Sequence, residues 1–241
     1  MPRFFVEQPP QDGVLTLEGE SAHHAARVLR LRPGEAVTLC DGRGMDFDCI
    51  VESVDRQTVV CRVQNSHPAL TEPAQRITLF MALPKGDKME WIVQKAVELG
   101  ASEIVPYLSK NCVSRPDRTE SKVERWRRIA VEAAKQCGRG VLPFVQPVIP
   151  FAQAAARAAQ DETALFLYEN ERQTGLRQAL AGGLGDTVSL LVGPEGGFAP
   201  EEAEAARRAG LKSVSLGTRI LRCETAPIAA LAAILYAGGN M

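Results

Sequence analysis

Long apolar runs are absent from this sequence, and so is a secretion signal. No stretch approaches the roughly 18 consecutive apolar residues that a membrane-spanning helix needs. The first residues, MPRFFVEQPP, lack the apolar centre of a signal peptide. With 45% hydrophobic residues, the chain can still bury an ordinary core. The sequence therefore predicts a soluble, cytoplasmic protein without a membrane segment.

Paired cysteines are also absent. Metal sites usually bring paired ligands at short spacing, and no two cysteines here are spaced as C-x-x-C, so we expect no bound metal. The neighbouring His23 and His24 do not change this, because adjacent residues on a helix point in different directions. We expect the thiols to be reduced and buried or half-buried: Cys40, Cys49, Cys61, Cys112, Cys137 and Cys223.

A strong net charge is missing as well, since the whole chain carries only −1. A balanced chain has no global field that would attract an anionic partner. The local balance differs: residues 1–65 hold seven basic and ten acidic side chains, whereas residues 115–139 hold eight basic and four acidic ones. Any anionic partner must therefore be held locally.

The N-terminal part of the chain is rich in short β-strand patterns. They are RFFV, GVLTL, EAVTLCD, MDFDCIVESVD and QTVVCRVQ, with a hairpin signal, DGRG, at 41–44. A helix is expected at 20–31, before the Pro33–Gly34 break. This pattern predicts a small β-barrel with one helix. The turn-rich stretch 65–75 predicts a linker, so we expect domains at 1–70 and 74–241.

After the linker, strand and helix patterns alternate. Strands are expected at 76–83, 102–109, 163–169, 187–193 and 213–217, and helices at 87–100, 119–139, 151–160, 173–181, 200–210 and 226–237. Such alternation predicts an α/β fold whose parallel sheet is covered by helices on both faces. The helix at 226–237 is apolar nearly all round, so we expect it to be buried, with a subunit interface as one place for it.

Three irregular segments follow the last expected strands. They are LYENE at 167–171, GPEGGFAP at 193–200 and LGTRILRCETAP at 216–227. Because ligands of open α/β sheets bind beyond the carboxyl ends of strands, these segments predict one pocket. The middle segment has neither common phosphate-binding pattern. No Lys-Ser or Lys-Thr follows its glycines, and Pro194 and Glu195 break the G-x-G-x-x-G spacing.

The charges near this segment also disfavour a phosphate ligand. A helix start favours anions by about 0.3–1 kcal/mol, but Glu201 and Glu202 occupy the start of the helix at 200–210. With Glu195 nearby, a di- or triphosphate would meet three carboxylates. We expect a neutral or partly cationic ligand that needs close backbone approach, which glycine permits. S-adenosylmethionine fits. The simpler alternative is that the glycines only form a tight turn.

In combination, five segments resemble the bacterial RsmE (YggJ) family. They are RFFV, HHAARVLRLRPGE, KGDKMEWIVQKAVELGASEIVP, VGPEGGF and LGTRILRCETAP, and the resemblance covers nearly the whole chain. It implies a PUA-like β-barrel followed by a SPOUT methyltransferase domain, with a deep trefoil knot in its C-terminal part. It also implies a homodimer that uses S-adenosylmethionine to methylate N3 of a uridine in 16S ribosomal RNA of the small subunit.

The resemblance also implies which residues form the cofactor pocket. Matching its motifs, we expect Leu167, Tyr168, Glu169, Gly193, Pro194, Glu195, Gly196, Gly197, Leu216, Gly217, Ile220, Leu221, Arg222, Thr225 and Ala226. Thr225 can in addition cap the last helix. Core packing is the alternative for Leu216, Ile220 and Leu221.

Methylation of a uridine at N3 requires that its proton leave or that the resulting charge be stabilised. Arg222 and Arg219 are the candidates for stabilising charge on the base, a role worth about 3–4 kcal/mol. Glu195 is a candidate for a base or for holding cofactor or substrate, and the sequence leaves both open. The alternative for the two arginines is a surface pairing with Glu224.

Basic side chains for RNA phosphates are expected outside the pocket. The candidates are Arg3, Arg27, Arg30, Arg32, Lys85, Arg115 and Arg125, with Lys88, Arg127 and Arg128 as further members. Arg3 stands beside Phe4 and Phe5, which could stack on unpaired bases or fill the barrel core. A solvated helix face is the alternative for 125–128.

Two other functions remain open from the sequence. One is a SPOUT enzyme that acts on another RNA, such as a transfer RNA. The other is a non-catalytic RNA-binding or assembly factor, in which the barrel binds and the second domain only dimerises. The two irregular segments at 193–200 and 216–227 argue against the second, because a scaffold does not need them.

Overall fold

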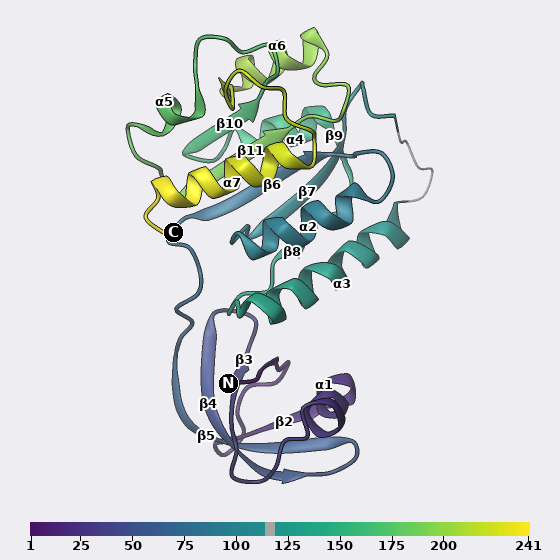
Figure 1. Ribbon diagram of the computed structural model, residues 1–241, viewed down its shortest axis with the longest axis vertical. Helices are drawn as coiled ribbons and strands as arrows, with labels where there is room; N and C mark the ends of the chain where they lie inside the picture. The colour runs from purple at the N-terminus through teal and green to yellow at the C-terminus, as the bar shows by residue number, and fades with distance from the viewer. Residues whose placement is uncertain (114–118) are drawn as a thin grey trace. The chain divides into compact units, whose positions relative to one another are not determined.

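The computed structural model describes residues 1–113 and 119–241 (Figure 1). The chain divides into two compact units. The first comprises Met1–Glu72 and Ala134–Leu142, and the second comprises Pro73–Ala133 and Pro143–Met241. The chain thus leaves the first unit after Glu72 and returns to it for one short segment. The sequence offered no sign of this return.

The first unit is built on one five-stranded sheet. Its strands are β1 (Arg3–Phe5), β2 (Val14–Glu18), β3 (Ala36–Cys40), β4 (Met45–Val54) and β5 (Thr58–Pro68), in the order β1-β3-β4-β5-β2. Only β1 and β3 are parallel, and the other pairs are antiparallel. In the described part of the chain, β1 and β2 form the two ends of this order and do not pair. The expected barrel is therefore a curled half-barrel.

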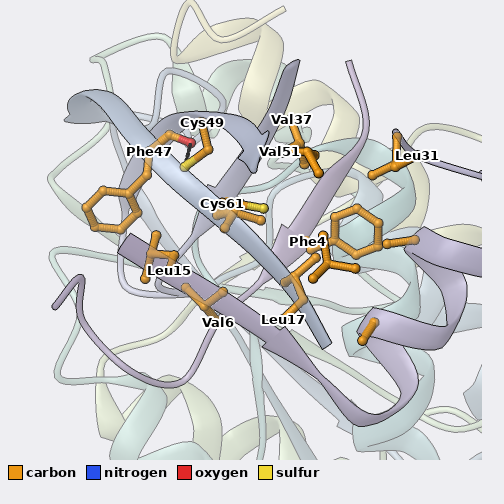
Figure 2. Close-up of a cluster of buried hydrophobic side chains, with 14 residues drawn as sticks. Phe4, Val6, Leu15, Leu17, Leu31, Val37, Phe47, Cys49, Val51 and Cys61 are labelled. Atoms are coloured by element: carbon orange, nitrogen blue, oxygen red, sulfur yellow. Dashed lines mark hydrogen bonds between the residues drawn. The ribbon is translucent and has the colours of Figure 1, made fainter. Parts of the chain in front are cut away.

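Alternating side chains give this sheet its core. In β2, Leu15 and Leu17 are buried while Thr16 and Glu18 are exposed, as the two-residue period of a strand requires. Figure 2 shows the buried cluster, to which every strand contributes. Burying one such aliphatic side chain stabilises the fold by about 1.5–3 kcal/mol. Phe4 belongs to this core, which answers the question left open for it.

The hairpin expected at DGRG is confirmed. It joins β3 to β4, and the Asp41 carboxylate accepts hydrogen bonds from the backbone N–H groups of Arg43 (2.7 Å) and Met45 (3.0 Å). The helix expected at 20–31 is shorter than predicted. It consists of α1 (Gly19–His23) and a π-helical segment, η1 (His24–Val28), after which Arg30 adopts a left-handed conformation. A wider helical turn cannot be read from apolar periodicity.

The returning segment is held to the first unit by the carboxylate of Glu72. It accepts hydrogen bonds from the backbone N–H groups of Gly140 (2.9 Å) and Val141 (3.1 Å) and pairs with the Arg139 guanidinium at 2.6 Å. The Arg139 side chain is only 3% exposed. The thiol of Cys40 also donates to the Gly140 carbonyl, at 3.0 Å. One carboxylate therefore accepts two backbone N–H groups of an irregular stretch whose strand pairing consists of one antiparallel bridge, between Val141 and Arg43.

The second unit contains the expected parallel sheet, which has seven strands where five were expected. The strand order is β12-β10-β11-β6-β7-β8, and β9 pairs with β7 as well. The strands are β6 (Arg76–Ala82), β7 (Glu103–Leu108), β8 (Phe144–Val145), β9 (Ile149–Pro150), β10 (Thr163–Leu167), β11 (Thr187–Val192) and β12 (Lys212–Val214). The short strands β8 and β9 lie in the proline-rich stretch after α3 and were not predicted.

Helices cover both faces of this sheet. As a result, all residues from Ile77 to Ala82 in its central strand are buried. The helices are α2 (Lys88–Glu98), α3 (Glu120–Cys137), α4 (Phe151–Ala158), α5 (Leu176–Leu180), α6 (Pro200–Ala209) and α7 (Thr225–Ala237). The α2 and α7 helices pack together, as do α4 and α6. Within the described residues, no helix is long and apolar enough to cross a membrane.

The last helix, α7, is only half buried. Leu231, Ile234 and Leu235 are covered, whereas Tyr236 is 76% exposed. Full burial was expected from its composition, which is apolar on every side. Composition cannot tell which of several equally apolar sides faces the sheet.

We expect Arg139→Met to lower the free energy of unfolding by about 3 kcal/mol, because it leaves the Glu72 carboxylate without its buried cation. Urea denaturation followed by circular dichroism measures the change. The matched control is Arg62→Met, which breaks the exposed pair with Glu52 and should leave the midpoint unchanged. Equal midpoints for both variants would contradict the role given to Glu72.

Candidate functional site

A cavity of about 590 Å³ lies at the carboxyl ends of β10, β11 and β12. These three strands are neighbours in the sheet, so the loops that follow them meet. Its volume is in the range of small-molecule sites. It is lined by Leu167, Tyr168, Glu169, Val192, Gly193, Pro194, Glu195, Gly196, Gly197, Val214, Ser215, Leu216, Gly217, Arg219, Ile220, Leu221, Arg222, Cys223 and Ala226.

Every residue expected in a cofactor pocket lines this cavity except Thr225. Four lining residues were missed by the sequence reasoning: Val192, Val214, Ser215 and Cys223. The first two are the last residues of β11 and β12, and strand ends could have been included on position alone. Thr225 opens α7, but Glu224 holds the N-cap position and no side chain caps the helix. The expected cap by Thr225 is therefore wrong.

The glycine loop at 193–197 is shaped by close contacts that a larger residue would break. Gly197 has φ +66°, and a Cβ there would lie 2.0 Å from a carboxylate oxygen of Glu169. The Asn111 side-chain amide donates to the carbonyls of Gly196 and Gly197, both at 3.2 Å. The loop after β7 thus supports the loop after β11, and the absence of side chains on the glycines keeps the cavity open.

A lysine and two carboxylates form an ion cluster beside this loop. The Lys88 ammonium lies 2.9 Å from Glu195 Oε1 and 3.2 Å from Glu224 Oε2. The backbone N–H of Lys85 also donates to Glu195, at 3.1 Å. Burial opposes ionisation of Glu195, but the ammonium and the N–H outweigh it and lower the pKa of its carboxyl to about 2. Glu195 is therefore ionised at neutral pH: it accepts hydrogen bonds, but it is a weak base.

The two glutamates at the start of α6 do not face the cavity. Glu202 is buried and accepts hydrogen bonds from Ser109 Oγ (2.9 Å) and from the backbone N–H groups of Lys110 (2.8 Å) and Ala199 (3.2 Å). Glu201 pairs with the Lys110 side chain. Neither lines the cavity, so the argument that three carboxylates repel a phosphate there was wrong for two of them. Sequence spacing predicts on which turn of a helix a residue lies, but it does not predict which loop the side chain contacts.

Arg219 and Arg222 are exposed residues that line the cavity. Within residues 1–113 and 119–241, neither guanidinium forms an ion pair or a hydrogen bond. The alternative pairing with Glu224 is not found, because Glu224 pairs with Lys88. Both arginines are therefore free to meet a negative charge brought by a ligand.

Cys223 is the thiol of the site. It is 8% exposed, and its Sγ donates to Glu224 Oε2 at 3.2 Å. Burial, with the neighbouring carboxylates Glu224 and Glu195, raises the pKa of the thiol to about 12. The sulfur therefore remains protonated at neutral pH and is not a nucleophile.

Family models match both units of this chain. The RNA methyltransferase domain model matches residues 71–235, and the RNA methyltransferase PUA domain model matches residues 17–64. The ribosomal RNA small subunit methyltransferase E of Bacillus subtilis is 34% identical over 98% of this chain and 96% of its own length. This chain belongs to the RsmE family. The family membership expected from the five sequence segments is confirmed.

Two further RsmE-family proteins are similar over nearly their whole length. The Mycobacterium bovis protein of the same name is 36% identical over 96% of this chain and 90% of its own. A crystal structure of the Neisseria gonorrhoeae protein, bound to S-adenosyl methionine, is 32% identical, with a TM-score of 0.86, and the match covers 98% of this chain and 97% of that one.

Three of the arginines expected to bind RNA lie exposed in the first unit of this RsmE-family protein. Arg27, Arg30 and Arg32 follow one another around η1 and the turn after it. Arg3 is different. Its side chain is 15% exposed, pairs with Asp46 and donates to the carbonyl of Arg139 at 3.1 Å. This placement argues against a phosphate contact by Arg3.

The basic candidates of the second unit are more varied. The Lys85 side chain is exposed, whereas the Arg125 guanidinium pairs with Glu90 at 2.8 Å. Arg127 donates to the Val145 carbonyl at 3.0 Å. Arg115 lies outside the described residues. No cluster of three or more His, Cys, Asp or Glu that could hold a metal occurs in the described part of the chain.

We expect Glu202→Gln to lower the free energy of unfolding by about 2 kcal/mol, because an amide group would place donor hydrogens against donors. The adjacent Glu201→Gln, at an exposed position on the same helix turn, is the matched control and should not shift the melting temperature. Thermal denaturation of both variants measures the difference. A stable Glu202→Gln protein would show that the buried carboxylate is dispensable.

Proposed function

We propose that this protein uses S-adenosylmethionine to methylate N3 of a uridine in the 16S ribosomal RNA of the small subunit. The observation that carries the proposal is the cavity at the ends of β10, β11 and β12. Residues separated by up to about sixty positions meet there, in the loops that matched the RsmE motifs. The names of the similar proteins and the bound ligand of the Neisseria relative support the same reading.

The cavity suits a cofactor without phosphate groups. S-adenosylmethionine supplies a methyl group carried on a positive sulfonium. Glu195 and Glu169 bring carboxylates to the lining, while Gly193, Gly196 and Gly197 allow a ligand to approach the backbone. We assign the holding of this cofactor to the predicted residues on the three loops. For Thr225, which lies just outside the lining, the assignment rests on the family motif alone.

The acceptor side of the site needs to stabilise negative charge. At neutral pH the uridine N3 carries a proton, and each pKa unit above the working pH adds about 1.4 kcal/mol to forming the anion. We assign Arg222 and Arg219 to stabilising that charge, because both residues line the cavity and their guanidinium groups have no carboxylate partners among the described residues. Glu195, with a pKa of about 2, is assigned to holding the loop and the cofactor rather than to accepting the proton.

We further propose that the first domain, 1–70, recognises RNA and that the second domain, 74–241, carries the reaction. Arg27, Arg30 and Arg32 would grip phosphates, which makes binding fall steeply with salt. In the second domain the exposed Lys85 is the strongest candidate, while Arg125 would have to leave Glu90. Arg115 remains a candidate from sequence, and Arg3 a weak one.

A trefoil knot in the C-terminal part and a homodimer complete the proposal. Both come from the family resemblance. The half-exposed side of α7 supports a dimer. It presents the largely apolar side chains of Ile228, Ala232, Ala233 and Tyr236, whose exposure to water is unfavourable. A ribosomal RNA substrate would assign the enzyme to the cytoplasm.

Methyl transfer to unmodified small ribosomal subunits, followed by nucleoside mass spectrometry, tests the function. N3-methyluridine is the expected product. Binding of S-adenosylmethionine without this product would mean that the acceptor is wrong. No binding at all would overturn the assignment of the cavity.

Arg222→Ala should lower kcat about 100- to 1000-fold and leave the affinity for S-adenosylmethionine within about threefold, because the lost donor acts on the acceptor base. Arg177, exposed on α5 and absent from the cavity lining, offers the control Arg177→Ala, which should keep full activity. Single-turnover kinetics and calorimetric titration give the two quantities. Normal turnover by Arg222→Ala would sink the assignment.

Gly197→Ala should weaken S-adenosylmethionine binding more than about tenfold, since the new Cβ cannot share space with the Glu169 carboxylate and the backbone there is left-handed. Gly182→Ala is the control, because a Cβ there meets nothing and the backbone is ordinary. Isothermal titration of both variants compares the dissociation constants. Unchanged affinity in Gly197→Ala would mean that the ligand does not use this loop.

A further inference from the structure

Lys88 joins three segments that are far apart in the sequence. It is the first residue of α2, and its ammonium contacts Glu195 in the glycine loop and Glu224 directly before α7. The three side chains are 31%, 29% and 26% exposed, so the cluster is largely covered by protein. Two of the three loops that line the cavity, 193–197 and 219–224, therefore share one cation.

Lys88 itself does not line the cavity, whereas Glu195 does. The sequence suggested a phosphate contact for Lys88. That role is disfavoured, because two carboxylates already neutralise the ammonium, and a phosphate would have to displace them. Lys88 can therefore affect the ligand only through the loops that it holds in place.

We propose that Lys88 is a positioning residue: it clamps the glycine loop to the start of α7 and so sets the shape of the cofactor cavity. The inference rests on the proposed function, because the ligand used to test it is S-adenosylmethionine. The residue is distinct from Arg219 and Arg222, which face the cavity and are assigned to the acceptor base.

The charge balance of the cluster makes the clamp testable. Burial opposes ionisation of both carboxyl groups, yet the pKa values of Glu195 and Glu224 are lowered. The Lys88 ammonium is the largest cause of the lowering at Glu195, whereas at Glu224 the residue's own backbone N–H and the Cys223 thiol contribute more than Lys88. Without the cation, the partly covered Glu195 carboxylate would lose the largest interaction that keeps it charged, and it would take up a proton more readily as the pH falls. The other groups that face the cluster are the backbone N–H of Lys85 and the thiol of Cys223. Arg219 and Arg222 line the same cavity.

The decisive variant is Lys88→Met, which keeps the length of the side chain and removes its charge. Isothermal titration with S-adenosylmethionine between pH 5 and pH 8 is compared with the wild type. We expect the wild-type affinity to be flat over this range, because Glu195 stays ionised throughout. In Lys88→Met, we expect affinity to be lower at every pH and to fall by a further factor of about ten towards pH 5.

Three companion variants separate positioning from general damage. Lys88→Arg should restore the flat profile, because a guanidinium can serve both carboxylates. Adding Glu195→Gln to Lys88→Met should remove the new pH dependence, since the titrating group is gone. Lys95→Met is the control on the same helix, where the lysine pairs only with Glu98 among the described residues, and it should behave as the wild type.

Glu224→Gln tests the arm that reaches α7 and is useful if Lys88→Met fails to fold. It should weaken S-adenosylmethionine binding several-fold and keep the profile flat, because Lys88 still holds Glu195. A Lys88→Met protein with wild-type affinity and profile, or a Glu224→Gln protein with wild-type affinity, would overturn the clamp. If the wild type itself binds no S-adenosylmethionine, the proposed function fails and not the clamp alone.

Discussion

Buried or half-buried carboxylates that accept backbone N–H groups hold several irregular segments of this molecule in place. Glu72 does so for the segment at 139–141, Glu171 for the turn at 173–174, Glu195 for Lys85 and Glu202 for the loop after β7. A loop at the end of a strand has N–H groups without ladder partners, and leaving them unpaired in the interior would cost about 1–3 kcal/mol each. Each carboxylate removes such a cost at one point of the chain. Of these four, Glu195 belongs to the lining of the cavity.

The same carboxylates decide which cations remain free. Lys88 and Lys110 are paired with glutamates around the glycine loop, and Arg125 is paired with Glu90. Arg219 and Arg222 are left without such partners in the described residues, and they lie on the loop that faces the cavity. Glu201 and Glu202 therefore do not act as a charge against phosphate in the cavity, as their place at the start of α6 first suggested. They hold structure at the start of the helix instead.

Much of the fold and most of the candidate site could be predicted from sequence, because strand periodicity and irregular strand ends are local signals. The cavity was found because its residues follow three expected strands. The prediction failed where direction mattered: Glu202 turns towards Ser109, Arg3 towards Asp46, and Lys88 towards Glu195. Residue spacing predicts the position of a side chain along its helix or strand, but it does not predict which side chain of another segment it contacts. The π-helical turn at His24–Val28 and the return at 134–142 also left no periodic trace.

That return has a consequence for how such a chain can evolve. The C-terminal turn of α3 belongs to one unit and the rest of the helix to the other. The two units are therefore connected by more than one segment of the chain. Exchanging the N-terminal unit as a cassette at residue 70 would separate Arg3 and Cys40 from the carbonyls of Arg139 and Gly140, which lie in the other gene segment. An insertion or deletion within α3 would shift the register of that shared segment. Recombination should therefore pass on this pair of units together, and their sequences should change in step.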